Sequence, residues 1–178
     1  MEALETNPAD TIDDVIDPVD EENQILSFTL GKEEYGVDIL RVQEIKGWEK
    51  TTAIPNTPEY VMGVINLRGA VVPIVDLRIR FSLKDISYNE STVVIIVRSE
   101  DLNGSNKIIG LVVDGVSDVY SISLEELQSA PSMSGKINTE YVNGLATFAD
   151  KMVVILHVDQ LINDGILKAV EEYIKHTH

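Results

Sequence analysis

The sequence predicts an all-β protein, and three observations support this fold class. From Gln24 onward, short runs rich in Val and Ile are interrupted about every ten residues by the turn-forming residues Gly, Asn and Asp. Only two segments have the spacing of apolar residues that is typical of a helix. In addition, two stretches in the first half of the chain resemble, in the same order, two stretches in the second half.

Ten apolar runs are predicted as strands. They are ILSFTL (25–30), YGVDIL (35–40), VQEIKGW (42–48), VINLR (64–68), VVPIVDL (71–77), TVVIIVR (92–98), IIGLVVD (108–114), SDVYSI (117–122), YVNGLATF (141–148) and MVVILHV (152–158). Four segments between them are predicted as hairpin connections, because Gly or Asn supplies the positive φ of a tight turn: residues 31–34, 67–69, 99–107 and 114–115.

The two predicted helices lie in the second half of the chain. In SLEELQSA (123–130), Ser123 can cap a helix and Glu126 follows three positions later, as in a capping box. A second apolar stripe runs from about Gly165 to Lys175. Its members are Ile166, Val170, Tyr173 and Ile174.

The internal resemblance predicts two similar β units. Residues 35–45 align with 109–119, and VVPIVDL (71–77) resembles VVILHVDQL (153–161). The alternative interpretation is that amphipathic strands look alike in general. Units of roughly 60 to 70 residues bury little core alone, so we expect the two to pack together with strands crossing between them. The aligned pairs are Gly36 with Gly110, Val42 with Val116, and Glu44 with Asp118.

Negative charge is concentrated at the N-terminus. The chain of 178 residues has a formal net charge of −16, and nine of its thirty acidic residues lie in residues 1–22, which contain no Lys or Arg. Two prolines and scattered aliphatic residues favour a disordered acidic leader there. The alternative is a docking peptide whose apolar residues share one helical face. Those residues are Ile12, Val15, Ile16 and Val19.

Composition also excludes classes of partner. Nucleic acid and anionic lipid select clusters of Lys and Arg, so an acidic chain argues against both. No apolar stretch of about 18 residues could span a bilayer, and the N-terminus lacks the pattern of a signal peptide. The chain has no cysteine and therefore no need of an oxidising compartment. We expect a cytoplasmic protein with no membrane insertion.

The sequence gives little support for catalysis. It contains no G-x-S-x-G, P-loop, G-x-G-x-x-G or H-E-x-x-H motif. His157 lies within an apolar run, and the other two histidines stand at the C-terminus. Asp76, Asp114 and Asp159 each close an apolar run, where an Asp commonly hydrogen-bonds its own turn, and no EF-hand pattern is present. We predict no enzyme, no metal site and no cofactor.

Two opposite charges interrupt the apolar runs. Glu44 alternates with Val42 along a predicted strand, and Arg68 lies at a predicted turn within VMGVINLRGAVVPIVDLRIRF (61–81). An exposed pair of this kind adds about 0 to 1 kcal/mol to stability. Alternatively, an Arg held by a carboxylate among aliphatic residues is typical of a binding hot spot, worth roughly 2 kcal/mol or more to a partner. From the residues alone, both interpretations stay open.

Six unusual strings occur in the chain in this order: EYGVDI, V-x-E-I, PNTP, GVINLRG, PIVDL and VDGVSDV. With them, the chain from Gln24 to about Leu161 resembles the CheW family of adaptors, which couple bacterial chemoreceptors to the histidine kinase CheA. The resemblance implies two intertwined five-stranded SH3-like β-barrels with a groove between them and a short C-terminal helix. The implied boundaries are 23–161 for the domain, about 28–86 and about 87–158 for the two barrels with strands exchanged, and 162–178 for the C-terminal helix and tail.

The resemblance also implies a function. The chain would be a non-enzymatic scaffold, monomeric when isolated, that is recruited to receptor arrays at the inner face of the membrane. There it would bind the receptor's helical tip and the regulatory domain of CheA, so that receptors control autophosphorylation of the kinase. Receptor-binding positions carried over are Ile39, Val42, Glu44, Gly63, Asn66, Arg68, Gly69, Gly110, Val113 and Val116; Met133 is carried over as the kinase contact.

Two other functions are less consistent with the sequence. A detached regulatory module of a kinase-related signalling protein is the main alternative, but no phosphotransfer helix, ATP-binding motif or receiver domain accompanies the chain. A small β-barrel hydrolase or nucleic-acid binder conflicts with the missing catalytic motifs and with the acidic charge.

Overall fold

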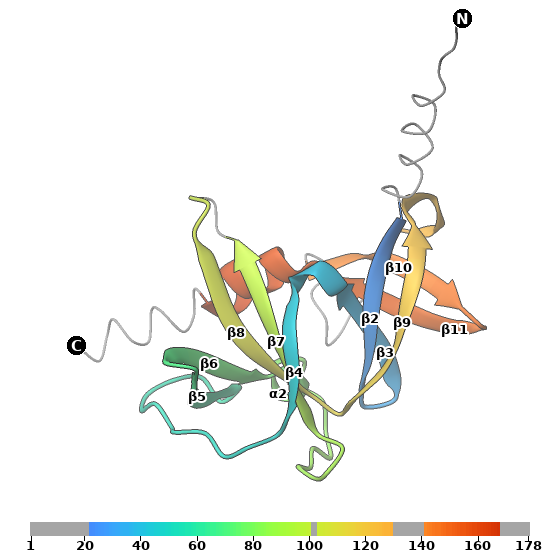
Figure 1. The fold of residues 1–178 in the computed structure, drawn as a ribbon. Helices are drawn as coiled ribbons and strands as arrows, with labels where there is room; N and C mark the ends of the chain where they lie inside the picture. Colours follow the sequence, from blue (N-terminus) through green and yellow to red (C-terminus); the bar gives the residue numbers. More distant parts are fainter. Residues whose placement is uncertain (1–21, 101–102, 130–140, 168–178) are drawn as a thin grey trace, which may run out of the picture.

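In the computed structural model, which describes residues 22–100, 103–129 and 141–167, ten strands form two five-stranded sheets (Figure 1). The first sheet has the order β10-β11-β3-β2-β9. Its strands are β2 (Glu22–Leu30), β3 (Glu33–Asp38), β9 (Gly115–Ser123), β10 (Val142–Phe148) and β11 (Lys151–Leu156). The second sheet has the order β4-β7-β8-β6-β5. Its strands are β4 (Val42–Gly47), β5 (Val61–Leu67), β6 (Ala70–Asp76), β7 (Val93–Glu100) and β8 (Asn106–Val113).

The predicted fold class is confirmed: the protein is all-β with two five-stranded units, and each predicted strand overlaps one observed strand. Each sheet takes strands from both halves of the chain. The four helical segments in the part of the chain that the structure describes are short. They are η1 (Ile39–Arg41), α2 (Leu77–Arg80), η2 (Leu124–Glu126) and η4 (Gln160–Leu167).

The two sheets repeat one another, as the internal resemblance predicts. When the first sheet is read from its other edge, as β9-β2-β3-β11-β10, it matches the second sheet, β4-β7-β8-β6-β5. The two then have the same connectivity and the same strand directions. Each sheet has one parallel pair, in which Gly110 lies opposite Ile74 and Gly36 lies opposite Ile155. A side chain at Gly36 or Gly110 would collide with neighbouring Ile and Val side chains, so the aligned glycines have the same packing role.

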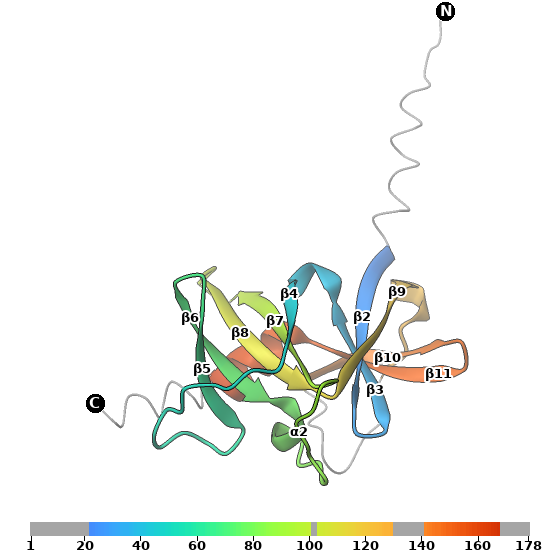
Figure 2. The same cartoon turned by 60° about the horizontal axis from the view of Figure 1, so that its bottom comes forward.

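The chain closes each sheet in the same way. Beyond β4, Thr52 forms a bridge with Val64 of β5, the strand at the far edge of the second sheet. Beyond β9, Gln128 forms a bridge with Leu145 of β10, the strand at the far edge of the first sheet. Each sheet is thereby curled so that its edge strands approach one another, as in a small barrel. Figure 2 shows the long segment that returns from β4 to β5.

One turn prediction is wrong. Asp114-Gly115 does not join a hairpin, because β8 belongs to the second sheet and β9 to the first. The chain bends there to pass between sheets. The other three predicted connections do join antiparallel neighbours: residues 31–34, 67–69 and 99–107 link β2 to β3, β5 to β6 and β7 to β8.

The predicted helices differ from the observed ones. Within residues 123–130 only η2 is helical, although the capping box forms: Glu126 Oε1 accepts from the Ser123 N–H at 2.9 Å. Gln128 then pairs with β10, which ends the helical turn. The C-terminal helix starts at Gln160, earlier than predicted, because Leu161 and Ile162 are fully buried. Residues 1–21 of the predicted leader (1–22) and residues 168–178 lie outside the described residues, whereas Glu22 begins β2.

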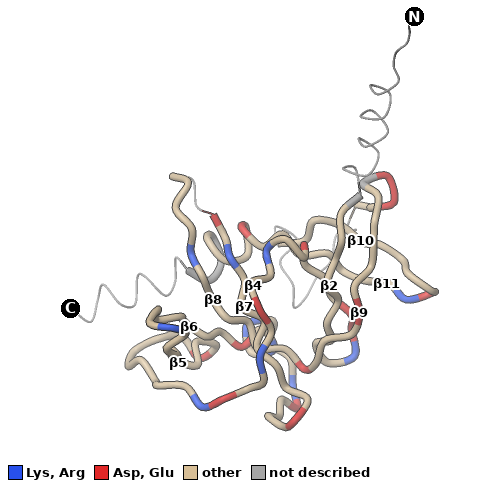
Figure 3. The backbone as a smooth tube through the Cα atoms, viewed as in Figure 1, with Lys and Arg blue, Asp and Glu red and all other residues tan. Residues whose placement is uncertain are grey.

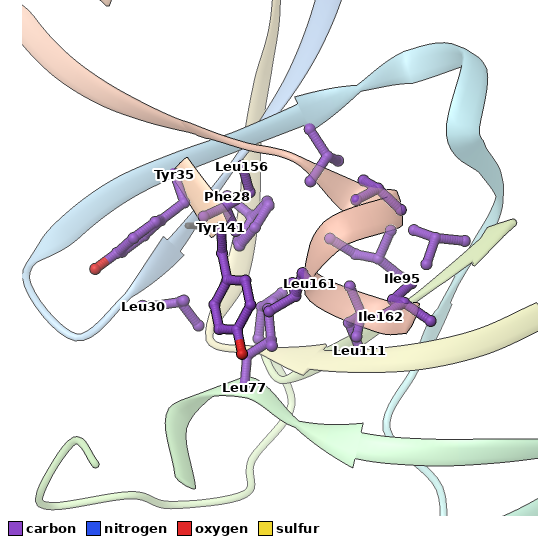
Figure 4. Packing of buried hydrophobic residues seen from close by; sticks show 14 of the residues in the cluster. Phe28, Leu30, Tyr35, Leu77, Ile95, Leu111, Tyr141, Leu156, Leu161 and Ile162 are labelled. Atoms are coloured by element: carbon purple, nitrogen blue, oxygen red, sulfur yellow. The ribbon is translucent and has the colours of Figure 1, made fainter. Parts of the chain in front are cut away.

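The largest hydrophobic cluster lies between the two sheets, with a smaller cluster inside each (Figure 4). On β7, Ile95 and Val97 face the central cluster, whereas Val94 and Ile96 face the interior of their own sheet. A strand buried on both faces reads as a continuous apolar run, which explains the string VVIIV. Figure 4 shows Leu161 and Ile162 of η4 beside Leu111 and Ile95, so the C-terminal helix completes this central core.

Candidate functional site

The candidate site is built on the two-residue turn between β5 and β6. Arg68 and Gly69 have φ values of 51° and 90°, the conformation that a tight hairpin of this length favours. The Asn66 side-chain oxygen accepts from the Gly69 N–H at 2.9 Å and pins the turn. We call residues 66–69 the Arg68 turn. Because the backbone is fixed, the Arg68 side chain leaves the surface in a defined direction and is 66% exposed.

Glu44 and Arg68 form an ion pair. Arg68 Nη2 donates to Glu44 Oε1, and this hydrogen bond, together with the charge of Arg68, lowers the pKa of the Glu44 carboxyl. Glu44 lies on β4 and Arg68 follows β5, the two edge strands of the second sheet. The ion pair therefore spans the place where this sheet closes on itself. It remains ionised at neutral pH and presents one donor-rich guanidinium beside one carboxylate.

Apolar residues flank this pair. Val42 and Ile39 are half-buried and pack against the central cluster, while Ile45 is 43% exposed on β4. Val116 is 36% exposed but lies on β9, in the first sheet. The structure thus brings together four of the carried-over receptor-binding positions: Glu44, Asn66, Arg68 and Gly69. Val42 lies on the same strand as Glu44.

Three carried-over positions have packing roles in the described residues. Val113 is fully buried in the central cluster, and Gly110 lies against Ile74, so neither contributes to an exposed surface. Gly63 has a φ of 131°, and a Cβ built there would stand 2.2 Å from the Thr52 carbonyl oxygen. Only a residue without a side chain allows the backbone to approach so closely here. Met133 lies outside the described residues.

The strongest electrostatic feature was not singled out from the sequence. Arg78 is 1% exposed, and its Nε and Nη2 each donate to the Asp76 carboxylate at 2.9 Å. Its Nη1 donates to Asp114 Oδ1 at 2.8 Å and to the Ser87 carbonyl at 2.7 Å. Tyr88 donates to Asp76 Oδ2 at 2.5 Å and packs its ring over the guanidinium. Burial lowers the pKa of Arg78, but its hydrogen bonds to Asp76 and Asp114 more than offset this and raise it overall.

Tyr88 gives this cluster a measurable titration. Burial, reinforced by its hydrogen bond to Asp76, raises the pKa of Tyr88 to about 12, and burial with the nearby Glu33 charge does the same for Tyr35. A raised tyrosine pKa stabilises the folded state below pH 10, and this contribution is lost as the pH rises from 10 to 12. Phenolate absorbance should therefore show that Tyr88 and Tyr35 titrate late, and Tyr88→Phe should remove one of these late titrations. Normal titration of Tyr88 would contradict the buried hydrogen bond.

A polar pocket of about 160 Å³ opens at the link between β3 and β4. Its charged walls include Asp38, Arg41 and Asp159, with His157 and Asn143 beside them.

In the described ranges, no three His, Cys, Asp or Glu side chains are placed to hold a metal ion. None of the helices in the described part of the chain has the length and hydrophobicity to cross a bilayer. Lys and Arg are dispersed among Asp and Glu over both sheets (Figure 3).

Comparison with known proteins gives a consistent result. A family model described as the CheW-like domain matches residues 24–165. The chain is 43% identical over 152 residues to a chemotaxis protein CheW of Klebsiella aerogenes, covering 85% of this chain and 89% of that protein. It is 33% identical over 143 residues to a probable chemotaxis protein CheW of Rhizobium etli, covering 80% and 89%. The crystal structure of the scaffolding protein TtCheW from Thermoanaerobacter tengcongensis matches with a TM-score of 0.67 and 36% identity, covering 75% of this chain and 83% of that one. The chain therefore belongs to the CheW-like domain family.

Proposed function

We propose that this protein is a non-enzymatic chemotaxis adaptor that couples the cytoplasmic tips of chemoreceptors to the histidine kinase CheA. It acts in the cytoplasm at receptor arrays on the inner face of the membrane and brings kinase autophosphorylation under receptor control. Membership of the CheW-like domain family supports the adaptor role, and the relatives named above are chemotaxis proteins. We infer that the isolated protein is a monomer.

The observation that carries the proposal is the exposed, oriented guanidinium of Arg68. A pinned turn and the Glu44 carboxylate hold it in place. An arginine that is already ordered loses little side-chain entropy on binding, so its hydrogen bonds contribute more to affinity. On the other face of β4, Ile45 is 43% exposed and Val42 is half-buried, and such apolar residues suit the apolar stripe of a helix. We infer that the receptor tip lies along β4 and the Arg68 turn.

The kinase surface is assigned only by family membership. We propose that it lies apart from the Arg68 turn, because an adaptor must hold both partners at once. Pairwise binding assays with a receptor-tip fragment and the CheA regulatory domain test this. Competition between the two partners for one site would contradict it.

The Arg68→Glu variant tests the receptor surface. This change places two carboxylates where an ion pair stood, so we expect the affinity for a receptor-tip fragment to fall by at least about tenfold. The free energy of unfolding should change little, because the Arg68 side chain is exposed. Isothermal titration calorimetry and urea unfolding measure the two quantities.

The control is the charge reversal at the partner residue. Adding Glu44→Arg restores an attractive pair, and partial recovery of affinity would show direct coupling between residues 44 and 68. Binding of the CheA regulatory domain should be unaffected by either change. Unfolding of Arg68→Glu, or unaltered receptor affinity, would contradict the proposed role.

A further inference from the structure

The chain passes between the sheets at two links within the described residues, and an Asp–Arg pair holds each link. One link is η1, between β3 and β4, and the other is Asp114, between β8 and β9. In Figure 1 the first link lies above the second. Each leads directly into the edge strand of the sheet that it enters. The geometry of these links therefore sets where β4 and β9 begin.

At the second link, Asp114 joins three elements. Its Oδ1 accepts from Arg78, which lies in α2 immediately after β6. Its Oδ2 accepts from the Gly31 N–H at 2.7 Å, at the end of β2. The Asp114 carboxylate thus connects the second link to α2, which follows the parallel strand β6, and to the β2–β3 hairpin of the first sheet.

At the first link, the same three kinds of element are joined. Arg41, the last residue of η1, donates from Nη2 to Asp159 Oδ2 at 2.7 Å. Asp159 follows β11, and its Oδ1 accepts from the Glu100 N–H at 3.0 Å, at the end of β7. Asn163 of η4 adds a hydrogen bond to the Glu100 carbonyl at 2.9 Å.

The internal repeat shows that the two arrangements correspond. Ile74 and Ile155 occupy equivalent places in the parallel pairs, so the residues four positions later, Arg78 and Asp159, are also equivalent. In the hairpins, Ser27 lies opposite Gly36 and Ile96 lies opposite Gly110, so Ser27 and Ile96 are equivalent. The residues four positions later, Gly31 and Glu100, are therefore equivalent as well. A similar device is therefore present twice, with the charges exchanged: the link carries Asp in one case and Arg in the other. The charged link residues are displaced by one position, because Gly36 and Gly110 are equivalent and Asp114 therefore corresponds to Leu40, the residue before Arg41.

The two pairs differ in burial. The Arg78 guanidinium is 1% exposed, whereas the Arg41 and Asp159 side chains are 30% and 25% exposed and line the polar pocket. At the position beside Arg78 that corresponds to this pocket lie Ser87 and Tyr88, which contact the guanidinium. Water reaches the Arg41–Asp159 pair, so it is the weaker of the two and the more sensitive to salt.

We propose that Arg41 and Asp159 are positioning residues for the receptor-contacting strand. They fix the direction in which the chain leaves the first sheet and enters β4, which carries Val42 and Glu44 immediately afterwards. Neither residue need touch the receptor. The effect on receptor binding rests on the proposed function, whereas the effect on the arrangement of the two sheets does not.

The absence of cysteine allows a direct test on the full chain. Spin labels attached through Val71→Cys and Met152→Cys, which are 69% and 57% exposed, report the distance between the two sheets by pulsed electron resonance. Arg41→Asp replaces an attractive pair by a repulsive one, and we expect a broadened or displaced distance distribution. The double variant Arg41→Asp with Asp159→Arg should restore it, because the other link uses that polarity.

Matched variants keep the test decisive. Lys50→Ala removes an exposed charge that belongs to neither pair and should leave the distribution unchanged. Arg41→Gln removes the charge without adding repulsion, so it replaces Arg41→Asp should that variant unfold. An unchanged distribution in the folded single variant, or no recovery in the double variant, would overturn the proposal.

Receptor binding is the second readout, measured on the unlabelled chain. We expect Arg41→Asp to weaken binding of a receptor-tip fragment about fivefold, and the double variant to bind within about twofold of the parent. A changed distance with unchanged receptor affinity would support the role of Arg41 and Asp159 in arranging the two sheets. It would refute their role in receptor binding. A tip fragment that does not bind even the parent protein would refute the proposed function instead.

Discussion

Arg78→Ala should lower the free energy of unfolding by about 3 to 5 kcal/mol, because it leaves the Asp76 carboxylate buried without its charge partner. Asp76 is 0% exposed, and two of the three side-chain hydrogen bonds that it accepts come from Arg78. Asp114 and the Ser87 carbonyl each lose a donor as well. Urea unfolding can be followed by the fluorescence of Trp48, whose ring lies 4.7 Å from that of Tyr88.

Two further variants separate burial from charge. Arg98→Ala removes an exposed guanidinium from β7 and should change the free energy of unfolding by no more than about 0.5 kcal/mol. Arg78→Lys keeps the charge but cannot donate in a fork to Asp76 while also reaching Asp114 and Ser87, so most of the loss should remain. Near-parental stability of Arg78→Ala would mean that water replaces the guanidinium.

The Gly63→Ala variant is expected to destabilise the protein by about 3 kcal/mol through the closure of the second sheet. A Cβ at this position would stand 2.2 Å from the Thr52 carbonyl oxygen, which is rigid backbone, and φ is 131°. Thr52 must then withdraw from Val64, with which it exchanges two backbone hydrogen bonds. Since β5 leads into the Arg68 turn, receptor affinity should fall as well.

Two other glycines serve as controls for Gly63. Gly69 has a φ of 90°, but a Cβ added there would meet no atom within 4 Å, so Gly69→Ala isolates the conformational cost, expected at about 1 kcal/mol. Gly47 has neither a positive φ nor a nearby atom, and Gly47→Ala should be close to neutral. Equal effects of all three changes in thermal unfolding would show that the contact with Thr52 is unimportant.

The sequence predicted the strands well because strand signals are local. Runs of β-branched residues and three of the four Gly- or Asn-containing turns could be anticipated from nearby residues. The pair of Glu44 with Arg68 spans 24 positions and is implied only by the resemblance to the CheW family. The Arg68 turn in particular has the positive φ values that its Arg-Gly pair and short length require. The internal repeat also carried real information, since it reappears as equal strand order in the two sheets.

The features that escaped prediction depend on distant contacts. Asp114-Gly115 has the composition of a hairpin turn, and only the partners of β8 and β9 show that it links two sheets. Arg78 meets Asp114 across 36 positions of sequence, so its burial has no local signal. For the same reason the sequence does not show that Val113 and Gly110, two of the receptor-binding positions that the resemblance implies, are packed inside the protein.

The exchange of strands between the two halves has a consequence for synthesis on the ribosome. β2 pairs with β9, and Glu22 lies opposite Ser123, so the first sheet cannot be completed until β9 has left the exit tunnel. The ribosome adds about 5 to 20 residues per second, so the roughly 100 residues between Glu22 and Ser123 take about 5 to 20 seconds to synthesise. During this time, β3 is the only strand available to pair with β2. In that interval its free edge can pair with other nascent chains. The pace of translation therefore sets how long this edge of β2 lacks its partner strand.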